Sequence, residues 1–94
     1  AKYTDTSKVS NSLIANGCII EGEVSNSIIF RRVKVQKGAV INNSIIMQNG
    51  TVKENAVLNH VIIDKNVIIE KEKELKGDKD FPLVIEKRLL YLEK

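Results

Sequence analysis

Few side chains in this 94-residue sequence have a chemistry that suits a functional site. His60 is its only histidine, and an imidazole can serve as a general base. However, His60 falls in a repeat, in the slot that serine fills in three other copies, so we interpret it as a solvated turn residue; a role as base is the alternative. Cys18 fills a slot that alanine takes elsewhere, which indicates a buried core thiol rather than a nucleophile.

The densest basic cluster of the repeat region is Arg31-Arg32, with Lys34 and Lys37 nearby. It follows a predicted strand at a corner, where guanidinium groups can meet a phosphate or an acidic partner surface. A plain solvated face is the simpler interpretation. We keep Arg31 and Arg32 as the candidate anion or interdomain contact.

The sequence predicts no catalytic, cofactor-binding or metal-binding residue. A single histidine excludes a three-histidine zinc site. There is no glycine-rich phosphate loop ending in Lys-Ser or Lys-Thr, and no pair of carboxylates is placed for acid–base work.

Composition limits the partners. Lys and Arg number 15 and Asp and Glu 12, a net charge of +3 spread evenly along the chain, so no basic stripe predicts nucleic-acid binding. No apolar run is long enough to span a membrane, and no leader peptide is visible. One cysteine cannot form an internal disulfide, which favours a reducing, cytoplasmic location. Because the chain begins with Ala1 rather than Met, we expect a piece of a longer protein.

The elements that must position these residues are short strands. Isoleucine and valine number 23, of which 21 precede residue 71, and all nine asparagines lie in the same region. β-Branched residues favour strands, and asparagine favours tight turns and left-handed backbone.

One motif recurs, at 11–14, 26–29, 43–46 and 59–62, with spacings of 15, 17 and 16 residues. Branched aliphatics recur six apart: Ile14 and Ile20; Ile29, Val35 and Ile41; Val52 and Leu58; Ile63 and Ile69. A small or β-branched residue often stands four after the first: Cys18, Val24, Val33, Ala39, Ala56 and Val67.

This hexapeptide rhythm predicts an all-β fold, a left-handed parallel β-helix (hexapeptide-repeat solenoid) of about three to four coils with trimmed corners. The alternative is an antiparallel meander with hairpin turns at Asn16-Gly17 and Asn49-Gly50. We favour the β-helix because the motif repeats in register as one unit, whereas a meander needs only alternation.

Three segments are expected: the repeats at 1–70, a charged loop at 71–80 and a C-terminal capping segment at 81–94. Ile85, Leu89 and Leu92 have the spacing of a short amphipathic helix, and Leu83–Ile85 could equally form a last strand. Either would cover the open end of the solenoid.

Specific phrases at 9–22, 24–33 and 59–67 resemble the C-terminal domain of the glucose-1-phosphate adenylyltransferase (ADP-glucose pyrophosphorylase) family, notably Ile-Ile-Asp-Lys-Asn-Val at 62–67. Residues 81–87 are similar to the close of the bacterial GlgD-type glycogen biosynthesis subunit. The resemblance covers about residues 3–87.

The resemblance implies a parent about four times as long. Its N-terminal nucleotidyltransferase domain would make ADP-glucose from ATP and glucose 1-phosphate, with Mg²⁺. This chain would be a non-catalytic domain that packs on that domain, helps to hold a tetramer together and contributes to allosteric regulation; the GlgD branch is regarded as a regulatory subunit with little activity. Exposed Phe30 and Met47 would contact the missing domain or another subunit.

Two alternatives stay open. One is a small trimeric hexapeptide acyltransferase, with an acyl carrier bound between subunits and His60 as base. The other is a nucleotide-sugar transferase of the mannose-1-phosphate guanylyltransferase type, which shares the architecture.

Overall fold

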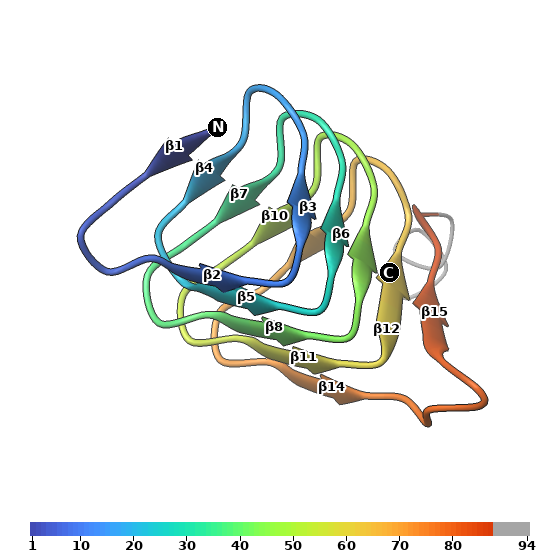
Figure 1. The fold of residues 1–94 in the computed structure, drawn as a ribbon. Coiled ribbons are helices and arrows are strands. Elements are labelled where there is room, and N and C mark those ends of the chain that lie inside the picture. Colours follow the sequence, from blue (N-terminus) through green and yellow to red (C-terminus); the bar gives the residue numbers. More distant parts are fainter. Residues whose placement is uncertain (88–94) are drawn as a thin grey trace.

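The chain winds as a three-sided coil of short strands (Figure 1). The structure is a computed structural model that describes residues 1–87. The strands are β1 Lys2–Tyr3, β2 Lys8–Ser10, β3 Leu13–Ile14, β4 Ile19–Ile20, β5 Glu23–Ser25, β6 Ile28–Ile29, β7 Lys34–Val35, β8 Val40–Asn42, β9 Ile45–Ile46, β10 Thr51–Val52, β11 Val57–Asn59, β12 Val61–Ile63, β13 Ile68–Ile69, β14 Glu74–Lys76 and β15 Leu83–Ile85.

Every third strand pairs in parallel, which produces three five-stranded sheets. Sheet A has the order β1-β4-β7-β10-β13, sheet B β14-β11-β8-β5-β2, and sheet C β15-β12-β9-β6-β3. The coil is left-handed and makes about four turns (Figure 1). The predicted parallel β-helix is confirmed. The meander is excluded for the described residues, because all their strand pairs are parallel; Asn16-Gly17 and Asn49-Gly50 form corners rather than hairpins.

The core is the stack of inward-facing aliphatic side chains from all three sheets. In doublets such as Ile28-Ile29 on β6, the second residue points inward and is 1% exposed, while the first points outward and is 40% exposed. Burying such a side chain stabilises the fold by roughly 1.5–3 kcal/mol. The sixfold spacing is confirmed, since its members from Ile20 to Ile69 are buried.

Three columns of tight turns connect the sheets. Corner 1 joins sheet C to sheet A and contains 16–17, 31–32, 48–49 and 65–66; corner 2 joins A to B, and corner 3 joins B to C. The left-handed positions at these corners are Asn11, Asn26, Asn43 and His60 in corner 3; Gly17, Arg32, Asn49 and Asn66 in corner 1; and Gly38, Asn55 and Glu72 in corner 2. Asparagine dominates because it tolerates this conformation better than most residues.

The repeat register differs from the predicted one at His60. Asn59 pairs with Asn42, and the His60 amide donates to the Asn42 carbonyl, so His60 stands in the left-handed slot of Asn43. The serine slot is instead filled by Val61, whose amide donates to Ser44 Oγ at 3.1 Å. The slot predicted for His60 was wrong by one residue because the aliphatic run Val61-Ile62-Ile63 supplies a doublet in either register, and Asn59 favoured the wrong one.

A second difference lies at corner 2 of the second coil, which is shorter than its neighbours. Successive coils are 17 residues apart at Ser25 and Asn42, but 15 apart at Asn11 and Asn26. The shortening places Val24 on the inner face of β5, and Gly22 takes the small-residue slot predicted for Val24. A Cβ on Gly22 would lie 2.4 Å from the Ala39 carbonyl oxygen, so the short corner requires glycine.

A column of serine hydroxyls runs up corner 3. Ser12, Ser27 and Ser44 each donate to the carbonyl two residues earlier, at 2.8–2.9 Å. Each hydroxyl also accepts the amide of the next coil, at 3.0–3.1 Å. This column pairs backbone groups that the narrow turn would otherwise leave buried without partners.

The segment predicted as a charged loop adds a rung to the solenoid. Within 71–80, β14 pairs with β11, and Leu75 packs against the core, because one apolar side chain at the inward position suffices among charged neighbours. Corner 3 is then extended from Gly77 to Pro82 before β15 pairs with β12, so Leu83–Ile85 is a strand. Leu89 and Leu92 lie outside the described residues.

Candidate functional site

The outer face of sheet C is a column of aliphatic side chains. Its members stand opposite one another on five successive strands: Leu13, Ile28, Ile45, Ile62 and Val84. Leu13 is 70% exposed, and Val84 is 45% exposed. Since strands lie about 4.8 Å apart, the column is about 19 Å long.

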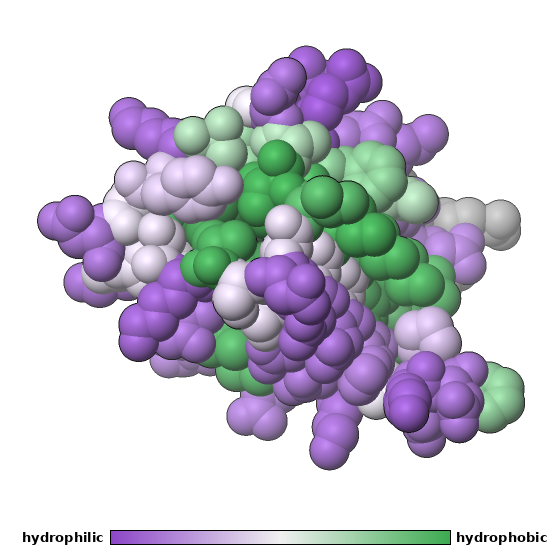
Figure 2. Space-filling model, in the orientation of Figure 1, coloured by the Kyte–Doolittle hydropathy of each residue, from purple (hydrophilic) through white to green (hydrophobic). Residues whose placement is uncertain are grey.

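A second apolar column borders the first on the side of corner 1. Ala15, Phe30 and Met47 follow the strands β3, β6 and β9, and their amides bond to the next coil in register. Phe30 is 40% exposed, and Met47 is half-buried. Figure 2 shows the result as a green band over sheet C, beside a hydrophilic ridge at corner 3. A continuous apolar band on a protein surface is typical of an interaction site.

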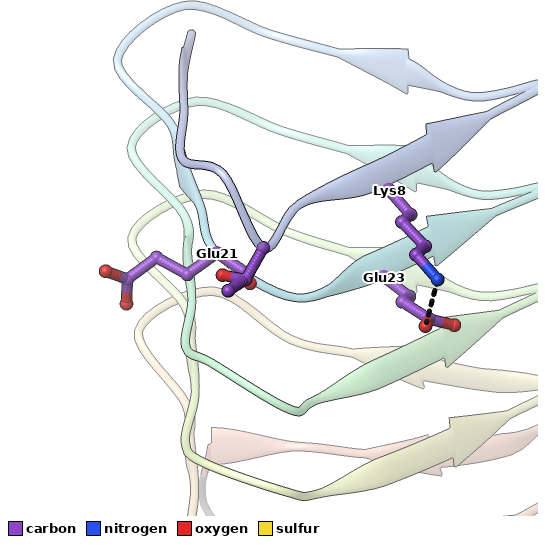
Figure 3. Close-up of polar contacts among 4 residues, drawn as sticks. Lys8, Glu21 and Glu23 are labelled. Atoms are coloured by element: carbon purple, nitrogen blue, oxygen red, sulfur yellow. Dashed lines mark hydrogen bonds and ion pairs between the residues drawn. The ribbon is translucent and has the colours of Figure 1, made fainter.

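The outer face of sheet B is mainly polar, although Val40 and Val57 are half-buried on it, and several of its polar side chains pair with one another. Lys8 on β2 forms an ion pair with Glu23 on β5, at 3.9 Å, while Glu21 at the corner points away from it (Figure 3). Further along, Ser25 Oγ donates to Asn42 Oδ1. This face therefore offers little that a partner would need to cover.

The arginine pair lies at corner 1, at the edge of the apolar face. Both side chains are exposed, and Arg32 has a left-handed backbone with φ 56°. Its Nε donates to Asn49 Oδ1 at 2.9 Å, which orients the guanidinium. Neither arginine forms an ion pair within residues 1–87. Of the two lysines grouped with them, Lys34 lies on the outer face of sheet A, and Lys37 lies at corner 2.

The other candidates are structural. Cys18 is 1% exposed, and its Sγ–H donates to the Phe30 carbonyl at 3.0 Å, so the predicted core thiol is confirmed. His60 is a turn residue, as predicted, but it is half-buried rather than solvated and stands in a different slot. No group of three metal-ligating side chains occurs within residues 1–87.

A hollow with a volume of about 470 Å³ lies on the first two coils, at corner 3. It is lined by Asn11, Ser12, Leu13, Asn26, Ser27 and Ile28. None of these residues titrates near neutral pH, so the hollow offers no acid or base. Over the described residues, 1–87, no helix has the length and apolar character needed to cross a membrane.

Sequence reasoning predicted Phe30 and Met47 as exposed contact residues but missed the column of Leu13, Ile28, Ile45, Ile62 and Val84. The available signal was the doublet. In a strand, adjacent residues point to opposite faces, so a pair of aliphatic residues repeated in every coil makes both faces of sheet C apolar. Only one of those faces can belong to the core.

Comparison with known proteins agrees with this architecture. Residues 1–81 match the family described as "GlmU-like, C-terminal hexapeptide". The chain is 55% identical over 89 residues to the "Glycogen biosynthesis protein GlgD" of Bacillus subtilis (strain 168), covering 95% of this chain and 26% of that protein. It is 62% identical over 86 residues to the protein of the same name from Geobacillus stearothermophilus, covering 92% of this chain and 25% of that protein.

The chain also matches the "Glucose-1-phosphate adenylyltransferase" of Fusobacterium nucleatum over a shorter stretch. This match is 49% identical over 39 residues and covers 42% of this chain and 10% of that protein. The chain thus spans about a quarter of the length of the two GlgD proteins it matches. The family match covers most of the solenoid, from β1 to β14. The chain belongs to the GlmU-like C-terminal hexapeptide family.

Proposed function

We propose that this chain is the non-catalytic C-terminal domain of a glucose-1-phosphate adenylyltransferase-type subunit in glycogen biosynthesis, most like GlgD. It serves assembly of the parent enzyme and allosteric regulation of ADP-glucose formation. The chemistry belongs to an N-terminal nucleotidyltransferase domain that uses ATP with Mg²⁺ in the cytoplasm. The GlgD matches over nearly the whole chain support the choice of subunit.

The observation that carries the assembly role is the apolar outer face of sheet C. Ile28 and Phe30 are each 40% exposed, on a rigid surface whose backbone is fully paired between coils. Leaving such a band in water is unfavourable by about 25 cal/mol per Å² of apolar area that a partner could cover. A flat, rigid, apolar sheet suits docking of another domain or subunit better than binding of a small substrate.

We attribute the regulatory role to the same surface. A domain that docks through one face changes the activity of its neighbour only if effector binding favours one docked arrangement over another. Arg31 and Arg32 border the face and form no ion pair among residues 1–87, and such positive charge suits contact with an acidic surface or a phosphate group. We assign this corner to the interdomain contact. The proposed partners are the N-terminal domain and further subunits of a tetramer.

The test compares Ile45→Lys on sheet C with Val57→Lys on sheet B, two half-buried β-branched residues at outward positions of neighbouring coils. We expect Ile45→Lys to abolish tetramer formation by the full-length parent and its activating effect on a catalytic partner subunit. Val57→Lys should leave both unchanged. Size-exclusion chromatography with light scattering, and ADP-glucose synthesis from ATP and glucose 1-phosphate, measure the two effects. Equal behaviour of the two variants would show that sheet C is not a docking face.

A further inference from the structure

Arg32 has a left-handed backbone conformation, and the corresponding positions of the other coils are filled by glycine or asparagine. In register with it along corner 1 stand Gly17, Asn49 and Asn66, all left-handed, with φ between 60° and 78°. Glycine and asparagine adopt this conformation readily, whereas an arginine is held there against its preference. A strained residue of this kind points to a role outside the stability of the fold.

The side chain of Arg32 is held in one direction by the coils on either side. Its Cγ lies 3.1 Å from the position that a Cβ on Gly17 would take, so Gly17 leaves room for the arginine stem. Its Nε bonds to Asn49 Oδ1 in the next coil. The two terminal nitrogens of the guanidinium form no hydrogen bond or ion pair within residues 1–87. An oriented guanidinium with its outer nitrogens free matches a carboxylate in fork geometry.

Within residues 1–87, no carboxylate forms an ion pair with the arginines of corner 1. Its remaining corner residues are neutral or basic, including Arg31 and Lys65. Asp64, the nearest acid along the chain, accepts the backbone amides of Lys65 and Lys87. Corner 2 is different, because Lys53 pairs there with Glu70 at 3.2 Å. In the part of the chain that the structure describes, the positive charge at corner 1 thus has no acidic partner.

The chain also enters the solenoid at this corner. The Lys2 amide bonds to the Cys18 carbonyl, directly after the corner-1 turn, so the N-terminus lies beside the coil that contains Gly17 (Figure 1). A polypeptide that precedes residue 1 is thus tethered next to corner 1 and the adjoining apolar face. It reaches both surfaces without a long connection.

We propose that the upstream part of the parent chain covers the outer face of sheet C with an apolar surface and places an acidic side chain on Arg32. This inference rests on the proposed function and adds where the charged part of the contact lies. The acidic side chain of the partner lies along the corner-1 edge of sheet C, not along the Asn and Ser residues of corner 3. Arg32 is the anchor that fixes how the two parts are oriented.

The test uses Arg32→Asn, which restores the residue found at Asn49, and Glu72→Asn as a matched control. Glu72 is likewise left-handed, at φ 63°, but it lies at corner 2, away from sheet C. In the 94-residue chain both variants should raise the melting temperature by about 4 °C or more, because both relieve strain. In the full-length parent, Glu72→Asn should again raise the first unfolding transition, whereas Arg32→Asn should lower it.

Equal shifts for Arg32→Asn in the chain and in the parent would overturn the proposal. A second result would also overturn it: inorganic phosphate stabilises the 94-residue chain, Arg32→Asn removes that stabilisation, and Arg32→Asn does not lower the unfolding transition of the parent. The ligand of Arg32 would then be a small anion. Ile45→Lys separates the two ideas. If it disrupts the parent while Arg32→Asn does not, sheet C remains a docking face and only the acidic anchor is wrong.

Discussion

Sheets B and C share one inner architecture and differ almost completely outside. Both present buried aliphatics to the core, such as Ile41 on β8 and Ile29 on β6. Outside, sheet B carries Lys8 and Glu23, which pair with each other, whereas sheet C carries Ile28 in an unpartnered apolar column. The inner faces are alike because each must fill the same solenoid core. The outer faces are free of that constraint, and we propose that their difference reflects what each one contacts.

The largest expected loss of stability tests whether the inner faces of sheets B and C contribute equally to the core. Ile29→Ala and Ile41→Ala should each lower the free energy of unfolding of the 94-residue chain by about 2–5 kcal/mol, since each leaves a cavity in a core that cannot collapse around a rigid coil. Chemical denaturation followed by circular dichroism measures both. A loss confined to one sheet would show that the core is not shared equally.

An intermediate effect is expected at corner 3, which joins the two sheets. Ser27 is 4% exposed; its hydroxyl donates to the Ser25 carbonyl and accepts the Ser44 amide. Ser27→Ala leaves that buried amide without a partner, so it should cost about 1–3 kcal/mol. Thermal unfolding provides the measurement, with Ser12→Ala at the exposed end of the column as the control of smaller effect. If the two substitutions are equally mild, the serine column does not stabilise the corner.

The smallest effects should come from the outer faces. Ile28→Thr on sheet C and Glu23→Gln on sheet B should each change the free energy of unfolding of the 94-residue chain by about 1 kcal/mol or less, because one side chain is already half in water and the other belongs to an exposed ion pair. Urea titrations of the two variants, run beside Ile29→Ala, make the comparison. A loss at Ile28 as large as that at Ile29 would mean that the outer column stabilises the fold itself and is not kept for a partner.

These effects also distinguish the residues that maintain the fold from the residues that we propose to serve an adenylyltransferase-type function. Substitutions inside the coil should act on the chain alone. Substitutions on the outer face of sheet C should act mainly on the parent, where Ile45→Lys and Arg32→Asn are expected to have their consequences. Hexapeptide architecture by itself does not specify a function, so we expect the function to depend on residues of the outer surface.

The sequence by itself determined the parallel coil, because β-branched residues six apart and asparagine at most of the left-handed turn positions satisfy local preferences that stack only in this way. It also marked Cys18 as buried and Phe30 as exposed. The sixfold spacing also marked the second isoleucine of a doublet such as Ile28-Ile29 as the buried one, whereas tertiary structure decided that the first members align as one outer column. Tertiary structure also decided that His60 takes the left-handed slot, that Gly22 closes a short corner, and that Leu75 adds a rung within a charged segment. These outcomes depend on hydrogen bonds between coils, and the pairing of strands so far apart along the chain is not written in any local run of residues.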